Sequence, residues 1–126
     1  MKTLILTNEY PPNIYGGAGV HVDYLSNSLA TMMDVEVRCF GTQDIKAKNL
    51  RVSGHTLDEN YFEKCPAHFQ PVFKSLSRCV SFNTDPIDAD VVHCHTWYSH
   101  FGGIAAKLAY GIPLVITIHS LEPLRP

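Results

Sequence analysis

Short apolar runs alternate with longer amphipathic segments along this chain of 126 residues. An apolar run of about four to eight residues suits a strand that is covered on both faces, and the segments between the runs have helical spacing. Strands that alternate with helices form parallel sheets through right-handed crossovers. We therefore predict an α/β fold with a Rossmann-like parallel sheet flanked by helices. The predicted strands are 3–7, 35–40, 90–94 and 114–118.

Two of the segments between the predicted strands have the spacing of an amphipathic helix, and a third, rich in small residues, is also predicted as a helix. The predicted helices are 20–33, 69–80 and 98–110, and Gly111 is placed to end the last one. The segment 44–60 is polar and poorly periodic, and only a short strand at 51–53 is predicted there. The tail 121–126 follows the last predicted strand directly and cannot close a core, so we expect a truncated piece of a longer protein.

Composition and charge argue against several classes of protein. The formal net charge is -2 and no run of Lys or Arg could neutralise phosphates, so we expect no nucleic-acid partner. The apolar runs are far shorter than the roughly 20 residues that span a bilayer, so we expect no membrane partner. The 4 cysteines form no Cys-x-x-Cys motif, which predicts free, buried thiols in a reducing cytoplasm rather than a zinc ribbon or a disulfide scaffold.

Polar and aromatic residues gather where the predicted strands end. In a parallel α/β sheet, ligands bind beyond the carboxyl ends of the strands. Three segments should meet there: 8–19 after the first strand, 95–98 after the third and 119–120 after the fourth. We therefore expect the functional site at this edge of the sheet.

The loop after the first predicted strand carries Gly16, Gly17 and Gly19. Glycine permits positive φ and close approach of a ligand, and the amides of the following helix would favour a phosphate or a sugar diphosphate. A tight turn that needs glycine for its own geometry is an equally good interpretation. The loop is not a dinucleotide fingerprint, because Val22 stands at the third glycine position, and it lacks the Gly-Lys-Ser/Thr of a Walker A loop.

Histidines stand at the ends of two predicted strands. His93 and His95 share one face of a strand, and with His119 they could hold a metal ion. No carboxylate is placed to complete such a site, so we predict no metal. We interpret His93 as a core residue and expect His95 and His119 to hydrogen-bond a sugar hydroxyl or a phosphate. Trp97 and Tyr98 either stack on a sugar ring or, as we slightly prefer, anchor their loop in the core.

Four motifs in order along the chain make the pattern far more specific. They are 8–12 (Asn-Glu-Tyr-Pro-Pro), 15–22 (Tyr-Gly-Gly-Ala-Gly-Val-His-Val), 90–97 (Asp-Val-Val-His-Cys-His-Thr-Trp) and 117–126 (Thr-Ile-His-Ser-Leu-Glu-Pro-Leu-Arg-Pro). Together they resemble the N-terminal half of a retaining GT-B glycosyltransferase of the bacterial glycogen (starch) synthase type. The resemblance is closest to the branch of short glycogen synthases and α-maltose-1-phosphate synthases.

The resemblance implies an enzyme of two Rossmann-like domains that face each other across a cleft. Such enzymes transfer glucose from ADP-glucose or UDP-glucose to an α-1,4-glucan with retention of configuration, and we expect no cofactor. Residues 1–126 would be the N-terminal, acceptor-side domain, without the nucleotide-binding C-terminal domain. We expect this part alone to be inactive, because its strand ends offer no Arg or Lys apart from Arg125.

Three other functions stay open. An α-maltose-1-phosphate synthase would use glucose 1-phosphate, a small sugar phosphate, as its acceptor. Another transferase would use the same type of nucleotide sugar with a different acceptor. The most distant alternative is a non-catalytic module that binds a nucleotide or a phosphosugar.

The resemblance also assigns roles to matched positions. Gly16 and Gly17 match the glycine pair that lies against the donor, and we group Gly19 with them as donor-binding. His95 matches a histidine near the donor glucose, and we predict it to be both catalytic and donor-binding. Thr96 replaces the aspartate of the family's His-Asp-Trp segment.

The acceptor side of the cleft is predicted from the same motifs. We expect Glu9, Tyr15, Trp97 and His119 to line it. Many glycogen synthases carry Lys-Thr just before the glycine pair, with the lysine touching the donor phosphate. This chain has Ile14 and Tyr15 there, so its donor would be held mainly by the other domain.

Overall fold

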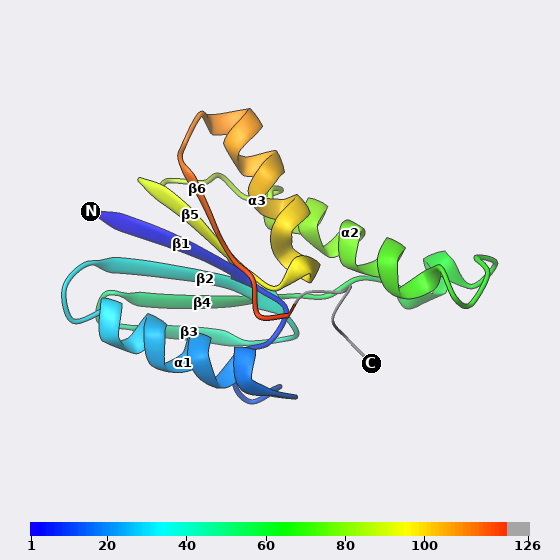
Figure 1. Cartoon of the computed structure of the whole chain (residues 1–126), viewed down its shortest axis with the longest axis horizontal. Coiled ribbons are helices and arrows are strands. Elements are labelled where there is room, and N and C mark those ends of the chain that lie inside the picture. The colour runs from blue at the N-terminus through cyan, green and yellow to red at the C-terminus, as the bar shows by residue number, and fades with distance from the viewer. Residues whose placement is uncertain (121–126) are drawn as a thin grey trace.

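The computed structural model describes residues 1–120 (Figure 1). All the predicted strands and helices are present, with shifted ends, and the tail 121–126, which includes Arg125, lies outside the described residues. The elements, in chain order, are β1 (Lys2–Thr7), α1 (Gly17–Leu29), β2 (Asp34–Phe40), β3 (Asp44–Ala47), β4 (Leu50–His55), the 3-10 helix η1 (Glu59–Phe62), α2 (Gln70–Phe82), β5 (Val91–His95), α3 (Trp97–Tyr110) and β6 (Leu114–Thr117).

The strands form one six-stranded sheet in the order β3-β4-β2-β1-β5-β6. Every neighbouring pair is parallel except β3 and β4, which are antiparallel. In the central strand β1, Ile5 lies between Val37 of β2 and His93 of β5. The parallel pairing brings the carboxyl ends of β1, β5 and β6 to one edge, as the sequence predicts.

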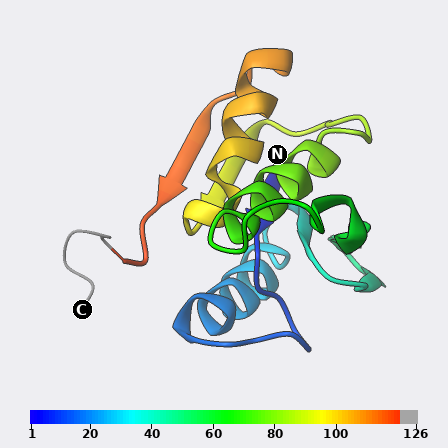
Figure 2. The same cartoon turned by 90° about the vertical axis from the view of Figure 1, so that its right-hand side faces the viewer.

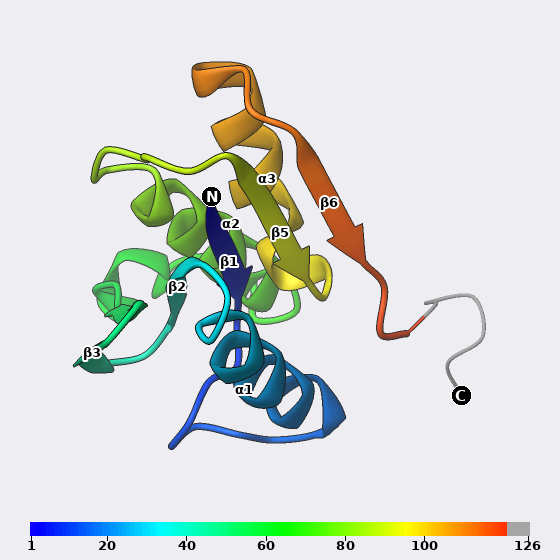
Figure 3. The ribbon, with the colours of Figure 1, turned by 90° about the vertical axis from the view of Figure 1, so that its left-hand side faces the viewer.

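Helices cover both faces of the sheet, with α1 on one side and α2 and α3 on the other (Figures 2 and 3). Each side has its own apolar core. Ile5 of β1 packs with Val22 of α1 on the first side, whereas Leu4 and Leu6 pack with Phe82 of α2 on the second. Leu4, Ile5 and Leu6 of β1 therefore alternate between opposite cores, which explains why the middle of this strand is continuously apolar.

The structure corrects the prediction for 44–60, because this segment forms a hairpin of β3 and β4 instead of one short strand at 51–53. The turn uses Asn49 at φ 61°, a conformation that asparagine tolerates. Leu50 and Val52 of β4 are buried in the core. Every residue of β3 is exposed, so this four-residue edge strand contributes no side chain to the core.

All 4 cysteines are free thiols. Cys39, Cys79 and Cys94 are buried, and burial raises the pKa values of their thiols to about 12, about 11 and about 12. Cys65 is only partly buried, so the expectation of burial is wrong for this residue. The three buried thiols stay protonated and act as small apolar core residues.

Strand β6 forms one edge of the sheet (Figure 3). Its apolar side chains are poorly covered, because Val115 is 47% and Ile116 is 41% exposed. Among residues 1–120, no helix combines the length and the apolar character that crossing a bilayer requires.

Candidate functional site

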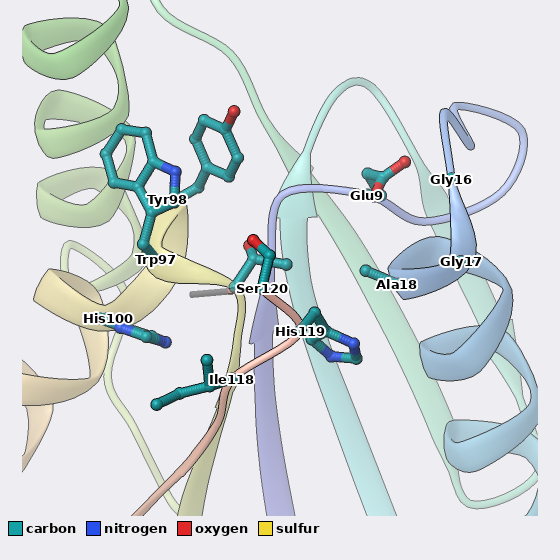
Figure 4. Close-up of a pocket in the computed structure, with 11 residues that line it drawn as sticks. Glu9, Gly16, Gly17, Ala18, Trp97, Tyr98, His100, Ile118, His119 and Ser120 are labelled. Atoms are coloured by element: carbon teal, nitrogen blue, oxygen red, sulfur yellow. The ribbon is translucent and has the colours of Figure 1, made fainter. Parts of the chain in front are cut away.

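A cavity of about 450 Å³ lies at the carboxyl edge of the sheet (Figure 4). It is formed by the loop after β1 with the first turn of α1, by the first turn of α3 and by the residues after β6. The three segments expected at this edge therefore meet around one space. The described residues that line it are Glu9, Gly16, Gly17, Ala18, Thr96, Trp97, Tyr98, His100, Ile118, His119 and Ser120.

Two helices begin at this cavity. Helix α1 begins at Gly17, earlier than the predicted Val20, and Gly16 is its N-cap; α3 begins at Trp97, and Thr96 is its N-cap. Gly16 has no side chain to cap α1, the Thr96 side chain makes no cap hydrogen bond to a described residue of α3, and neither first turn has an acidic residue. The first N–H groups and the positive ends of both helix dipoles can therefore interact with an anionic group in the cavity.

The loop glycines differ in what they do. None of them adopts a positive φ. A Cβ on Gly19 would lie 3.1 Å from Cβ of Glu9 and from side-chain carbons of Ile14, so Gly19 serves the packing of α1 against its loop rather than the cavity wall. A Cβ on Gly16 or Gly17 would meet no described atom within 4 Å, so a ligand can approach the backbone there.

Glu9 and Tyr15 are brought together by the loop but do not face the same space. Glu9 is buried and lines the cavity, and its Oε1 accepts a hydrogen bond from the backbone N–H of Tyr15. The Tyr15 side chain is 85% exposed and lines a smaller depression together with Asn13 and Arg78. Glu9 thus lines the cavity, whereas Tyr15 lies beside it.

Four imidazole rings form a histidine cluster next to the cavity: His21, His93, His95 and His119. The ring centroids of His93 and His95 are 4.1 Å apart, as expected for two residues on one face of a strand. His21 of α1 lies 5.5 Å from the ring centroids of both His95 and His119. Nδ1 of His95 lies 3.1 Å from Nε2 of His119, and Nε2 of His93 hydrogen-bonds Oγ1 of Thr117 at 2.6 Å.

Burial and the neighbouring imidazoles favour the neutral forms of His93, His95 and His119. Burial, and after it the neighbouring imidazoles His93, His119 and His21, lower the pKa of His95 to about 3. The pKa values of His93 and His119 are also lowered, first by burial and then by nearby histidines, although Glu9 opposes the shift at His119. At neutral pH these imidazoles can therefore accept a hydrogen bond as well as donate one.

The structure separates the two histidines that were expected to contact ligand. His119 lines the cavity, and Figure 4 shows its ring directed toward α1. His95 is completely buried and is not among the described lining residues, and its Nε2 has no hydrogen-bond partner within residues 1–120. His95 is connected to the cavity through its hydrogen bond to His119, which lines it.

Thr96, at the junction of β5 and α3, adopts a strained backbone conformation. Its φ of 68° and ψ of 155° lie in a region that non-glycine residues, and β-branched ones above all, rarely adopt. Its Oγ1 donates a hydrogen bond to Oδ1 of Asn8 at 2.9 Å, which joins the ends of β5 and β1. Strain of this kind at a cavity wall is typical of functional sites.

An aromatic wall faces the glycine loop across the cavity (Figure 4). Trp97 is 37% exposed and stacks on Tyr98 with ring centroids 4.2 Å apart, so the prediction that Trp97 anchors its loop in the core is wrong. His100 also lines this wall; burial lowers its pKa, and its Nε2 has no partner among the described residues. Sequence reasoning missed His100, although it lies within one helical turn of Trp97.

A cationic side chain does reach this edge of the sheet, although none follows the strand ends within residues 1–120. Arg78 of α2 lines two depressions beside the ends of β1 and β2, and Asn8 lines both of them. Sequence reasoning missed it because a helix distant in the sequence carries it there. Among the described residues, no group of three or more His, Cys, Asp or Glu side chains could hold a metal ion.

The sequence matches the family model "Glycosyltransferase Family 4" over residues 15–126. It is 38% identical to the α-maltose-1-phosphate synthase of Mycolicibacterium smegmatis, over 100% of this chain and 30% of that protein. It is 33% identical to the glycogen synthase of Mycobacterium tuberculosis, over 97% of this chain and 34% of that protein. The chain thus spans about a third of the length of these relatives.

The fold has a counterpart among solved structures. The sucrose-phosphate synthase of Thermosynechococcus elongatus superposes with a TM-score of 0.55 at 16% sequence identity, over 96% of this chain and 34% of that one. This likeness supports the fold, a Rossmann-like domain of the GT-B type. The match to the family model over most of its length shows that the chain belongs to glycosyltransferase family 4.

Proposed function

We propose that this chain is the N-terminal, acceptor-side domain of a retaining GT-B glucosyltransferase that uses ADP-glucose or UDP-glucose as its donor. The observation that carries the proposal is the cavity on which the first turns of α1 and α3 converge. A nucleotide-binding C-terminal domain of the full-length protein would face this cavity across a cleft.

The donor side of the cavity is the glycine loop. A departing nucleoside diphosphate develops negative charge, which preorganised hydrogen-bond donors stabilise. The backbone is open at Gly16 and Gly17, and the first N–H groups of α1 begin there. Because Ile14 and Tyr15 stand where related enzymes carry Lys-Thr, we assign most of the diphosphate binding to the C-terminal domain.

The sugar side of the cavity combines the aromatic wall with neutral histidines. Trp97 can stack on a sugar ring, and His119 can hydrogen-bond a sugar hydroxyl. We assign the sugar contact to His119. We assign a positioning role to His95, because its Nδ1 lies 3.1 Å from Nε2 of His119 and orients that ring.

We place glucose 1-phosphate first as the acceptor. This choice rests on the higher identity to the α-maltose-1-phosphate synthase of M. smegmatis, 38%, than to the glycogen synthase of M. tuberculosis, 33%. An α-1,4-glucan, the acceptor that the sequence motifs favour, is the second candidate because of that glycogen synthase. We place the enzyme in the cytoplasm, where reducing conditions would preserve the free thiols.

The test is nucleoside diphosphate release by the full-length protein from ADP-glucose and from UDP-glucose, with glucose 1-phosphate, glycogen or no acceptor. We expect release that depends on glucose 1-phosphate and a disaccharide phosphate as the product. Release that depends on glycogen alone would select the second candidate, and no release from either donor would refute the proposal.

Two aromatic residues at opposite ends of α3 provide a matched pair of variants. Trp97→Ala should lower kcat/KM at least tenfold, because Trp97 lines the cavity. Tyr110→Ala removes an aromatic ring of similar exposure at the other end of the helix and should leave kcat/KM within twofold of wild type. Equal effects of the two variants would contradict the placement of the site.

A further inference from the structure

A second depression, of about 410 Å³, adjoins the candidate site on the side of α2. Its walls include Asn8 from the end of β1, Gln70, Lys74 and Arg78 from α2, and Tyr98 from the start of α3. Tyr98 also lines the first cavity, so one aromatic side chain forms the wall between the two spaces. In Figure 4 this residue lies across the first cavity from the glycine loop.

Two cations of α2 line this second depression. Lys74 and Arg78 are four residues apart, which places them on the same face of the helix about one turn from each other. The Arg78 guanidinium lies over the ring of Phe40, 5.0 Å from its centroid, and this contact fixes its position at the end of β2. Both side chains are half-buried, which strengthens their interaction with an anion relative to exposed cations.

We propose that Lys74 and Arg78 form the subsite for the phosphate of a sugar-phosphate acceptor. This inference rests on the proposed function, which it deepens by separating the acceptor phosphate from the donor diphosphate. A guanidinium presents a planar fork of N–H donors that matches phosphate oxygens, and a lysine adds a point charge. The donor would lie against the glycine loop, the reacting sugars in the first cavity and the acceptor phosphate beyond Tyr98.

A neutral acceptor would gain little from such a pair of cations, whereas glucose 1-phosphate carries a charge at the end that does not react. The subsite would therefore select phosphorylated over neutral acceptors. Binding energy from this remote phosphate would position the acceptor hydroxyl for attack on the donor sugar.

The experiment compares Lys74→Gln and Arg78→Gln in the full-length protein with Lys48→Gln as the control. Lys48 is an exposed lysine in the turn between β3 and β4, beyond the sheet edge opposite to β6. Each subsite variant should raise the KM for glucose 1-phosphate by about 10- to 100-fold, the loss expected for a charge-assisted hydrogen bond. The KM for the nucleotide sugar should stay within twofold of wild type, and Lys48→Gln should change neither value.

An unchanged KM for glucose 1-phosphate in Lys74→Gln would overturn the proposal. So would an equal rise of the KM values for donor and acceptor, because that would indicate a general disturbance of the fold. If Arg78→Gln loses its packing on Phe40 and fails to fold, Lys74→Gln alone decides the question.

Direct binding separates a failure of the subsite from a failure of the proposed function. Calorimetric titration of glucose 1-phosphate and of maltose into the full-length protein needs no turnover. If wild type does not transfer glucose to glucose 1-phosphate but binds it, and Lys74→Gln does not, the proposed acceptor fails while the phosphate subsite stands. The subsite is refuted if wild type binds neither compound. It is also refuted if Lys74→Gln binds glucose 1-phosphate as tightly as wild type does.

Discussion

Nδ1 of His95 lies 3.1 Å from Nε2 of His119, so one of these nitrogens carries hydrogen and donates a hydrogen bond that the other accepts. Two protonated rings could not keep this contact, because both facing nitrogens would carry hydrogen. His119 lines the cavity and His95 is buried behind it. The buried ring therefore fixes the orientation of the ring that meets the ligand, and the pair requires at least one neutral imidazole.

The histidine cluster should make the protein less stable in mild acid. The pKa of His95 is lowered to about 3, whereas an unfolded histidine titrates near 6.5, so only the unfolded chain binds this proton between those values. The stabilisation is complete above pH 6.5 and is lost as the pH falls from about 6.5 toward about 3. Each such histidine contributes up to about 1.4 kcal/mol per pH unit to the slope of the free energy of unfolding.

Urea unfolding of wild type and His95→Asn between pH 7.5 and 4 measures this contribution. His95→Asn removes one titrating group, so its free energy of unfolding should fall less steeply with decreasing pH than that of wild type. The carboxylates titrate in both proteins, and the difference between the two slopes therefore isolates His95. Parallel slopes would contradict the prediction.

Alanine at Gly17 and at Gly19 should have opposite effects. Gly17 is in the first turn of α1 and has open space around a Cβ, so Gly17→Ala should keep or raise the free energy of unfolding by up to about 1 kcal/mol while weakening donor binding. Gly19→Ala would place its Cβ 3.1 Å from Glu9 and Ile14 and should destabilise the fold by about 1–3 kcal/mol.

Urea unfolding and the donor KM of the full-length protein test both glycine variants. The expected pattern for Gly17→Ala is a wild-type transition midpoint with a KM raised about tenfold. A loss of stability in Gly17→Ala as large as in Gly19→Ala would show that the glycine pair serves the fold rather than a ligand.

The sequence predicted the central strands because their apolar runs reflect burial on both faces. It also predicted that His93 and His95 share a face, because side chains alternate along a strand. It did not predict that His21 joins them, since the rotation of α1 about its axis is fixed by how Val22 packs on the sheet. The approach of Arg78 to the sheet edge likewise depends on helix packing, which no local pattern encodes.

Arg38 should be one of the least replaceable residues of the fold. It is 3% exposed, its Nε contacts Glu36 at 2.7 Å, and its Nη atoms donate to the carbonyls of Phe82, Asp85 and Pro86. These bonds tie β2 to the segment between α2 and β5. Arg38→Met leaves a carboxylate and several carbonyls without this partner and should destabilise the protein by about 3–5 kcal/mol.

Arg51→Met is the matched control for this change. Arg51 lies on the neighbouring strand β4 and is exposed, so its replacement should alter the free energy of unfolding by no more than about 0.5 kcal/mol. Chemical denaturation of both variants measures the difference. Similar midpoints for the two would show that the buried bonds of Arg38 contribute little.

The protein should be more stable with glycine at position 96 than with alanine there. Both replacements lose the hydrogen bond from Oγ1 to Asn8, but only glycine adopts φ 68° and ψ 155° without strain. The free energy of unfolding of Thr96→Gly should therefore be about 1–3 kcal/mol higher than that of Thr96→Ala. At Thr56, an exposed loop residue without positive φ, the order should reverse, because glycine adds flexibility to the unfolded chain. Urea unfolding of the four variants tests both orders, and a higher stability of alanine at both positions would show that Thr96 is not strained.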